Sequence, residues 1–186
     1  TIEHLLTHVS GLRADLPLEE VFEGAATAIA RAADEVPETG PGERFVYSDI
    51  NFFVLGEIVR RVTGQTLDQF ARDRIFRPLG MRDTGFNPPA SLGPRIAPTE
   101  PCAPLAWPCG GDGAVMLRGR VHDPTARRMG GVAGHAGLFS TAGDLARFCR
   151  MLLGAGTLDD VRILAPLTVA RMTRVSTPPQ MADRRG

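Results

Sequence analysis

The sequence contains no lysine: all 21 of its basic side chains are arginine, and they are balanced by 21 aspartate and glutamate residues. Arginine does not release its proton in proteins, whereas a desolvated lysine can, so this chain offers no lysine as a catalytic base. The formal net charge is zero, and no basic stripe with interleaved aromatic residues is present. The composition therefore indicates that nucleic acid is not a partner.

Cysteines and long apolar runs are also scarce. The three cysteines form no metal-binding pattern, and their odd number argues against a disulfide framework. Cys102 and Cys109 bracket a proline-rich loop and could pair, whereas Cys149 lies in a helical pattern that predicts a core position. No apolar run is long enough to span a bilayer, and no signal peptide opens the chain. We therefore expect no membrane segment here, and the cellular location stays open.

The apolar content of 43% is typical of a globular domain, and its spacing predicts several helices. Asp15 is expected to cap a first helix that starts at Pro17. Ser48 is expected to cap a second helix over about 50–63. The apolar faces predicted for these two helices comprise Leu18, Val21, Phe22, Ala25 and Ile29, and Phe52, Leu55, Ile58, Val59 and Val62.

Two capping boxes predict further helices. Thr66 with Gln69 opens one that runs to about Arg77, and Thr141 with Asp144 opens another over about 142–153. The second of these helices is expected to turn Leu145, Phe148 and Leu152 inward, and Pro166 can start one more short helix. Strand signals are limited to short runs near 45–46, 115–117 and 138–140, and the segment 87–133 around Trp107 is rich in proline and glycine.

Tyr47-Ser48-Asp49 is the strongest candidate for a functional motif. Tyr47 is the only tyrosine, and it lies between a Pro-Gly turn at 41–42 and an apolar helical run. A phenol delivered to the start of a helix can accept or pass a proton at a pocket wall. The alternative is an ordinary half-buried aromatic side chain.

Four segments place this motif in a family context. They are 1–12 (TIEHLLTHVSGL), 44–62 around the motif, 75–86 (IFRPLGMRDTGF) and 137–148 (GLFSTAGDLARF). In this order they resemble the serine β-lactamases and penicillin-binding-protein-like hydrolases, nearest to the class C-like members. The resemblance implies an α+β, β-lactamase/transpeptidase-like fold, in which a helical region packs beside an antiparallel sheet. This chain would hold mostly the helical region, with few short strands.

The resemblance also implies acyl transfer by a serine nucleophile, with an acyl-enzyme and an oxyanion hole of backbone N–H groups. The family's Ser-x-x-Lys and Lys-Thr-Gly motifs are absent because the chain has no lysine. We therefore expect residues 1–186 to be a partial domain that lacks the preceding nucleophile segment and the following sheet segment. Such a fragment should be inactive by itself and poorly stable.

By resemblance Tyr47 relays the serine proton, and Asp49 stands where the family pattern has Asn. Ionised Asp only accepts hydrogen bonds, whereas Asn also donates them, so the substrate could be a β-lactam, a D-amino-acid peptide or an ester. His135 is a candidate substrate-lining residue, although its glycine-rich surroundings also suit a simple tight turn. Relatives act on small-molecule or peptidoglycan-type substrates in the cell envelope, and no cofactor or metal is expected.

The sequence also leaves alternatives to the serine hydrolase interpretation. The parent protein could be a non-catalytic peptidoglycan- or peptide-binding relative, or the chain could be a truncated remnant. His4 and His8 have the spacing of two metal ligands on one helix face but lack the intervening glutamate of a His-Glu-x-x-His site. A triad of Asp123, His135 and Ser140 is rejected because no Gly-x-Ser-x-Gly elbow supports it.

Overall fold

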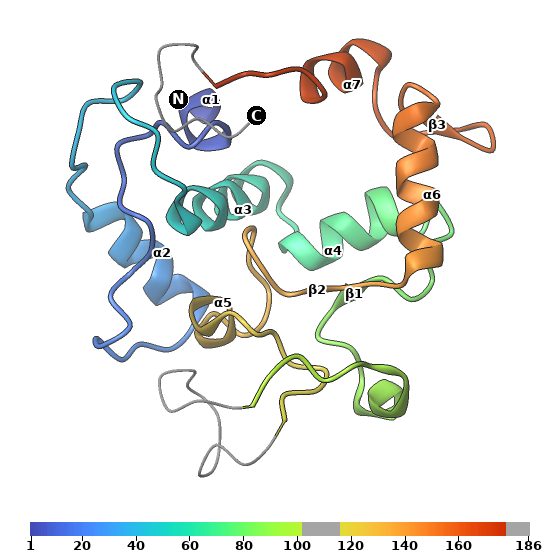
Figure 1. Cartoon of the computed structure of the whole chain (residues 1–186), viewed down its shortest axis with the longest axis horizontal. Coiled ribbons are helices and arrows are strands. Elements are labelled where there is room, and N and C mark those ends of the chain that lie inside the picture. The colour runs from blue at the N-terminus through green and yellow to red at the C-terminus, as the bar shows by residue number, and fades with distance from the viewer. Residues whose placement is uncertain (102–115, 178–186) are drawn as a thin grey trace.

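The computed structural model describes residues 1–101 and 116–177, and helices dominate it (Figure 1). The α-helices are α1 (Ile2–Leu6), α2 (Ala25–Asp34), α3 (Asp49–Thr63), α4 (Leu67–Ala71), α5 (Pro124–Arg128), α6 (Ala142–Leu153) and α7 (Pro166–Met172). A π-helical turn, η1 (Arg72–Phe76), continues α4, and a 3-10 helix, η2 (Ala90–Arg95), follows β1. Cys102, Cys109 and Trp107 lie outside the described residues.

Two short antiparallel strand pairs complete the described fold. β1 (Gly85–Phe86) pairs with β2 (Leu138–Phe139), with Gly85 opposite Phe139. β3 (Thr157–Leu158) pairs with β4 (Val161–Arg162). The run at 138–140 was predicted as a strand and forms β2, whereas 45–46 is not a strand. The mostly helical α+β architecture with few short strands is therefore confirmed.

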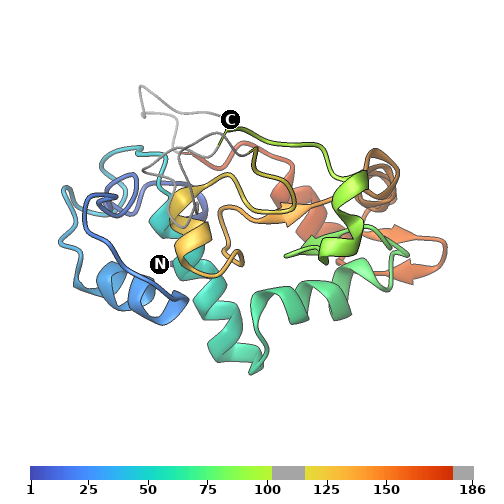
Figure 2. The ribbon, with the colours of Figure 1, turned by 90° about the horizontal axis from the view of Figure 1, so that it is seen from below.

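Helix α3 lies at the centre of the molecule. α2 and α5 flank it on one side, and α4 leads from its end toward α6 (Figure 1). Figure 2 shows α2, α3 and α4 along one side of the flattened molecule, with the segments around 86–101 and 116–130 across the other. α3 ends at Gly64, whose left-handed backbone (φ 72°) lets its N–H bond the Arg60 carbonyl.

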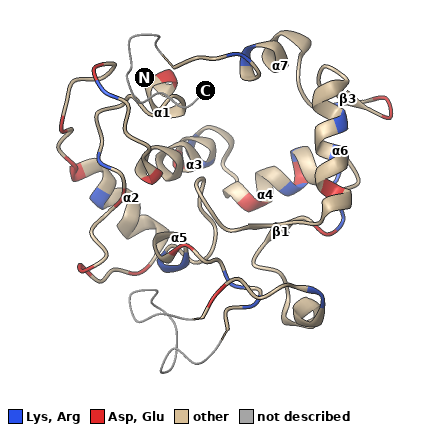
Figure 3. Cartoon of the chain, viewed as in Figure 1, with Lys and Arg blue, Asp and Glu red and all other residues tan. Residues whose placement is uncertain are grey.

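Two apolar cores stabilise the described fold. The first joins α2, α3, α5 and the segments beside them: Leu16, Phe22, Ala28, Ala32, Ile50, Phe53, Val121, Ala126, Met129 and Ala133. The second joins α4, η1, α6 and β3: Ala71, Phe76, Leu79, Met81, Met151 and Leu158. Basic and acidic residues are interspersed over the surface elements (Figure 3). Within residues 1–101 and 116–177, no helix combines the length and apolar content needed to cross a bilayer.

The helix predicted from Pro17 is wrong, because α2 begins only at Ala25 after Gly24. The Asp15 carboxylate does not cap a helix; it accepts from the Leu16 N–H at 2.7 Å and from the Thr125 hydroxyl at 2.8 Å. The segment before α2 is instead held by α5, since Arg128 donates to the Leu18 carbonyl at 2.9 Å. Long-range hydrogen bonds thus override a local helix signal here.

The predicted helix faces are only partly correct. α3 buries Ile50, Asn51 and Phe53, whereas Val62 is 80% exposed. α6 buries Met151 completely and leaves Leu145 half exposed, and Cys149 is exposed rather than in the core. By contrast, the Thr66–Gln69 capping box is confirmed, and so are the Thr141 cap of α6 and the start of α7 at Pro166.

Candidate active site

Tyr47 lies at the wall of an open hollow just before α3. Its side chain is 60% exposed, and its ring is tilted against the His8 ring with centroids 4.5 Å apart. Alongside Tyr47, a hollow of about 770 Å³ is lined by Leu6, His8 and Phe45 and by residues 171–177. Figure 1 shows the two helices that frame it, α1 and α7, along one edge of the molecule. The phenol is therefore open to a substrate or to a further segment of protein.

His8 and Asn51 hold this wall in place. The Ser48 N–H donates to His8 Nδ1 at 3.0 Å, and the Ser10 hydroxyl donates to Asn51 Oδ1 at 2.6 Å. Burial lowers the pKa of His8, which favours the neutral ring that accepts this bond. Asn51 is fully buried, so it does not take the place of the Asn that the family motif has at the position of Asp49. His4 Nδ1 lies 3.5 Å from the amino nitrogen of Thr1.

Asp49 and His135, predicted as substrate-lining residues, lie close together in the structure. With Asp123 they form the Asp–His cluster, in which one ligand atom from each residue lies within 4.8 Å of the other two. Asp49 is the first residue of α3, and its N–H donates to the Ala14 carbonyl at 2.7 Å. Burial raises the pKa of the Asp49 carboxyl, and the charges of Asp123 and Asp15 add to that shift while His135 opposes it.

Asp123 anchors the cluster from α5. As the N-cap residue, its Oδ1 accepts from the Ala126 N–H at 2.6 Å and lies 2.9 Å from His135 Nε2. Burial alone would raise the pKa of Asp123, but the hydrogen bonds from His135 and Ala126 outweigh it and hold the pKa below its usual value. The His135 side chain is only 4% exposed, and its ring packs edge-on against Phe53.

A close backbone approach brings His135 to α3. Gly134 passes directly over the helix, and a Cβ added there would lie 2.0 Å from the Phe52 carbonyl oxygen. Any larger residue would push the loop and His135 away from Asp49. Ser140 bonds Thr84 at 2.8 Å and not His135, which agrees with the rejection of a serine triad at this position.

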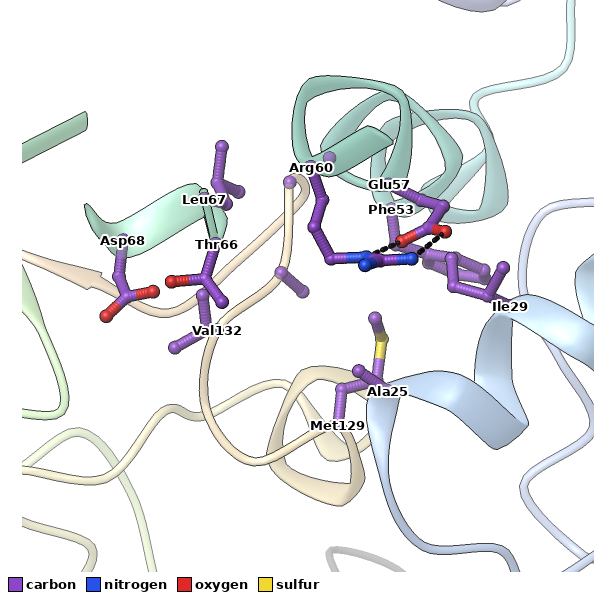
Figure 4. Close-up of a pocket in the computed structure, with 13 residues that line it drawn as sticks. Ala25, Ile29, Phe53, Glu57, Arg60, Thr66, Leu67, Asp68, Met129 and Val132 are labelled. Atoms are coloured by element: carbon purple, nitrogen blue, oxygen red, sulfur yellow. Dashed lines mark hydrogen bonds and ion pairs between the residues drawn. The ribbon is translucent and has the colours of Figure 1, made fainter. Parts of the chain in front are cut away.

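A second, smaller hollow lies beside α2 and α3 (Figure 4), and Gly134 is among the residues that line it. Its volume is about 240 Å³, and Phe53, Ile29 and Met129 make its wall largely apolar. At its rim Glu57 accepts from Arg60 at 2.7 and 2.8 Å. The hydrogen bonds from Arg60 and then Arg61 lower the pKa of Glu57 to about 2. Its charged rim groups Glu57 and Arg60 are paired with each other, so we assign this hollow no catalytic role.

Sequence reasoning missed how these residues come together. Asp123 entered only the rejected triad, and nothing in the local pattern joins Asp15, Asp49 and Asp123. The one signal was Asp123-Pro124, a helix cap followed by proline at the first helical position.

Comparisons with known proteins agree with the family expected from the motifs. The family model described as Beta-lactamase matches residues 1–186. A protein of Salmonella schwarzengrund (strain CVM19633), named as a candidate D-alanyl-D-alanine carboxypeptidase, is 35% identical over 190 residues. The match covers 92% of this chain and 43% of that protein, so the chain spans less than half the length of this curated relative.

Solved structures share the fold. A penicillin-binding protein homologue from Caulobacter crescentus superposes with a TM-score of 0.67 at 24% identity, covering 94% of this chain and 48% of that one. A D-amino acid amidase from Ochrobactrum anthropi SV3, solved with D-phenylalanine, gives 0.64 at 23% identity, covering 90% and 46%. At this identity the likeness concerns the fold alone.

Proposed function

Because the chain belongs to the β-lactamase family, we propose that the protein it represents is a serine hydrolase that works through an acyl-enzyme. The observation that carries this proposal is the exposed Tyr47 phenol at the wall of a wide hollow, at the position where the family motif has tyrosine. The acyl donor would be a β-lactam, a D-amino-acid peptide or an ester.

In this proposal Tyr47 takes the proton of the attacking serine and returns it to the leaving group. A phenol serves as a base only where a nearby cation stabilises the phenolate. Arg171 lines the same hollow but is ion-paired with Glu3, and the chain has no lysine. The serine and its lysine partner would therefore belong to a segment outside these 186 residues, and residues 1–186 would form a partial domain that is inactive alone.

We propose that Asp49 and His135 contact the substrate in the complete protein. In the described residues neither lines the hollow beside Tyr47, and the His135 side chain is only 4% exposed. An ionised Asp49 can only accept hydrogen bonds, so it suits a substrate group that donates them, such as an amide N–H or the ammonium group of a D-amino-acid derivative. This preference separates the protein from relatives whose motif ends in Asn.

A fluorescent penicillin and a fluorophosphonate, applied to the full-length protein, test the proposal. The expected result is a covalent serine adduct with the fluorophosphonate that prior incubation with a β-lactam or a D-alanyl peptide blocks. The 186-residue chain alone should give no adduct. Full-length protein that stays unlabelled by both reagents would instead support a non-catalytic peptidoglycan- or peptide-binding role.

A further inference from the structure

His8, in the turn after α1, bears on how the Tyr47 phenol is held at its hollow. The backbone of His8 is left-handed, with φ at 57°, a conformation that residues other than glycine adopt rarely. Such a conformation persists only where the surrounding structure holds it, and it is common at functional sites. His8 contacts the residue before Tyr47, the residue after it and the tyrosine ring itself.

The two chain neighbours of Tyr47 both bond His8. The Val46 N–H donates to the His8 carbonyl at 2.9 Å, and the Ser48 N–H donates to His8 Nδ1 at 3.0 Å. Ser48 is fully buried, so loss of this acceptor would leave its N–H unpaired away from water. One residue therefore fixes the backbone on both sides of the phenol.

Nδ1 of His8 is suited to accept this bond. Asn51 accepts from the Ser10 hydroxyl through Oδ1 at 2.6 Å, which leaves its amide Nδ2 at 3.5 Å from His8 Nδ1. Two donors, the Ser48 N–H and the Asn51 amide, thus lie beside the same ring nitrogen. An imidazole that carries its proton on Nε2 satisfies both, and burial favours this neutral ring because it lowers the pKa of His8.

The His8 ring also supports the phenol directly. The ring centroids of His8 and Tyr47 are 4.5 Å apart, with an angle of 31° between the ring planes. Phe52 and Phe45 lie near the same imidazole, with centroids at 5.0 and 5.8 Å. The Tyr47 side chain is 60% exposed and its hydroxyl bonds no described residue. Its orientation therefore depends on the contact with His8.

We propose that His8 is a positioning residue for Tyr47, which holds the phenol in the orientation where it can exchange a proton with the attacking serine. This inference rests on the proposed function, because the orientation matters to a reaction only if Tyr47 is the proton relay. His8 would act through the backbone of residues 46–48 and through the tyrosine ring, without taking the proton itself. A displacement of about 1 Å in a reacting group can lower a rate about 100-fold.

Two substitutions in the full-length protein test the role of the His8 acceptor. Glycine and asparagine both tolerate the left-handed backbone, so His8→Gly and His8→Asn add little strain at this position. The asparagine Oδ1 lies as many bonds from the backbone as Nδ1 and can accept the Ser48 N–H, whereas glycine offers no acceptor.

The rate of adduct formation with a fluorophosphonate, measured over a range of reagent concentrations, is the first readout. At saturating reagent, His8→Gly should react at least about tenfold more slowly than the wild type, with the half-saturating concentration changed by less than about twofold. His8→Asn should recover a rate within about threefold of the wild type. If His8→Gly does not fold, His8→Gln takes its place, because its amide oxygen lies one bond too far out to replace Nδ1.

Amide hydrogen exchange at Ser48, followed by nuclear magnetic resonance, is a readout that does not depend on activity. Exchange should be at least about tenfold faster in His8→Gly than in the wild type, and close to the wild-type rate in His8→Asn. Ala155→Gly is the matched control, because Ala155 has a similar left-handed backbone, with φ at 51°, in the turn between α6 and β3. It should change neither readout.

The two readouts separate this inference from the proposed function. Adduct formation at the wild-type rate in His8→Gly, or equally slow formation in His8→Gly and His8→Asn, would overturn the positioning role. A wild-type protein that forms no adduct would contradict the proposed function instead. Hydrogen exchange would then decide alone, and exchange at Ser48 in His8→Gly at the wild-type rate would overturn the inference.

Discussion

Two regions meet at the start of α3, and they are built in opposite ways. Tyr47, before the helix cap, is 60% exposed on an open hollow and touches mainly the His8 ring. Asp49, after the cap, faces a cluster in which His135 is 4% exposed and bonded to Asp123. The Tyr47 region leaves its phenol exposed, whereas the Asp–His cluster pairs its imidazole with a carboxylate inside the chain.

The two regions therefore differ in what each would need from outside the chain to take part in a reaction. The Tyr47 region needs a nucleophile and a cation from elsewhere to do chemistry, because the chain has no lysine. The Asp–His cluster is held by bonds within the described chain, from His135 to Asp123 and from the Ala126 N–H to Asp123. Three substitutions, ordered by the expected loss of unfolding free energy, test this comparison.

Gly134→Ala should have the largest effect and should act on the Asp–His cluster. The added Cβ would lie 2.0 Å from the backbone oxygen of Phe52, so the loop must move. We expect a loss of unfolding free energy of about 3 kcal/mol, the upper part of the usual range for overpacking. Urea denaturation measures this loss.

Gly143→Ala is the control for this change. Gly143 lies in the first turn of α6, where an added Cβ meets only the Thr141 hydroxyl at 3.9 Å, so alanine should be neutral or slightly stabilising. Equal stability of the two variants would show that the close approach of Gly134 to α3 does not hold His135 in place.

Asn51→Ala should have the next largest effect and should act on the Tyr47 region. Asn51 is fully buried and accepts from the Ser10 hydroxyl at 2.6 Å, which ties the turn after α1 to α3. Its loss leaves that hydroxyl without its acceptor, at a cost of about 2 kcal/mol. Thermal unfolding of Asn51→Ala, Ser10→Ala and the double variant measures the coupling energy between Asn51 and Ser10. If the losses of unfolding free energy in the two single variants simply add up in the double variant, the coupling is contradicted.

Glu57 lies in α3 but belongs to neither region. Its replacement should change the free energy of unfolding least. Hydrogen bonds from Arg60 and Arg61 lower its folded pKa to about 2, below the ordinary 4.5. Its stabilisation is therefore fully present above about pH 4.5 and is lost as the pH falls toward 2. Because both arginines are more than half exposed, we expect only about 1 kcal/mol.

Urea denaturation of Glu57→Gln at pH 7 and pH 3 checks the pH dependence. The variant should have a lower free energy of unfolding than the wild type at pH 7, and this difference in free energy should be smaller at pH 3. Glu38→Gln, at an exposed site without an ion pair among the described residues, should show no difference at either pH. A difference in unfolding free energy between Glu57→Gln and the wild type that grows as the pH falls would contradict the predicted direction of the pH dependence.

The features that the sequence predicted well are local ones. The capping signals at Thr66 and Thr141 depend on residues three positions apart, and the structure confirms both helix starts. Of the two, it forms the full capping box only at Thr66, because the Asp144 carboxylate accepts from Asp83 and Thr84 instead. The mostly helical fold and the family also follow from short motifs. Each of these signals lies within a few residues of the feature that it predicts.

The features that the sequence predicted poorly depend on long-range packing. The helix expected from Pro17 is replaced by turns because Arg128 and Thr125, more than one hundred residues away, bond this segment. The buried face of α3 and the exposure of Cys149 follow from which neighbours cover each helix, and a periodic pattern does not specify those neighbours. The Asp–His cluster needs the same information, since only the folded chain brings Asp49 to Asp123.

The most direct test of the central claim is the rate at which full-length Tyr47→Phe protein is acylated by a fluorescent penicillin. Removing a positioned proton-transfer group typically costs a factor of about 10² to 10⁴ in rate. We predict a loss in that range for Tyr47→Phe with the melting temperature unchanged, because the phenol is exposed and its hydroxyl bonds no described residue. Acylation of Tyr47→Phe at the wild-type rate would contradict the claim that this chain supplies the proton relay of a serine hydrolase.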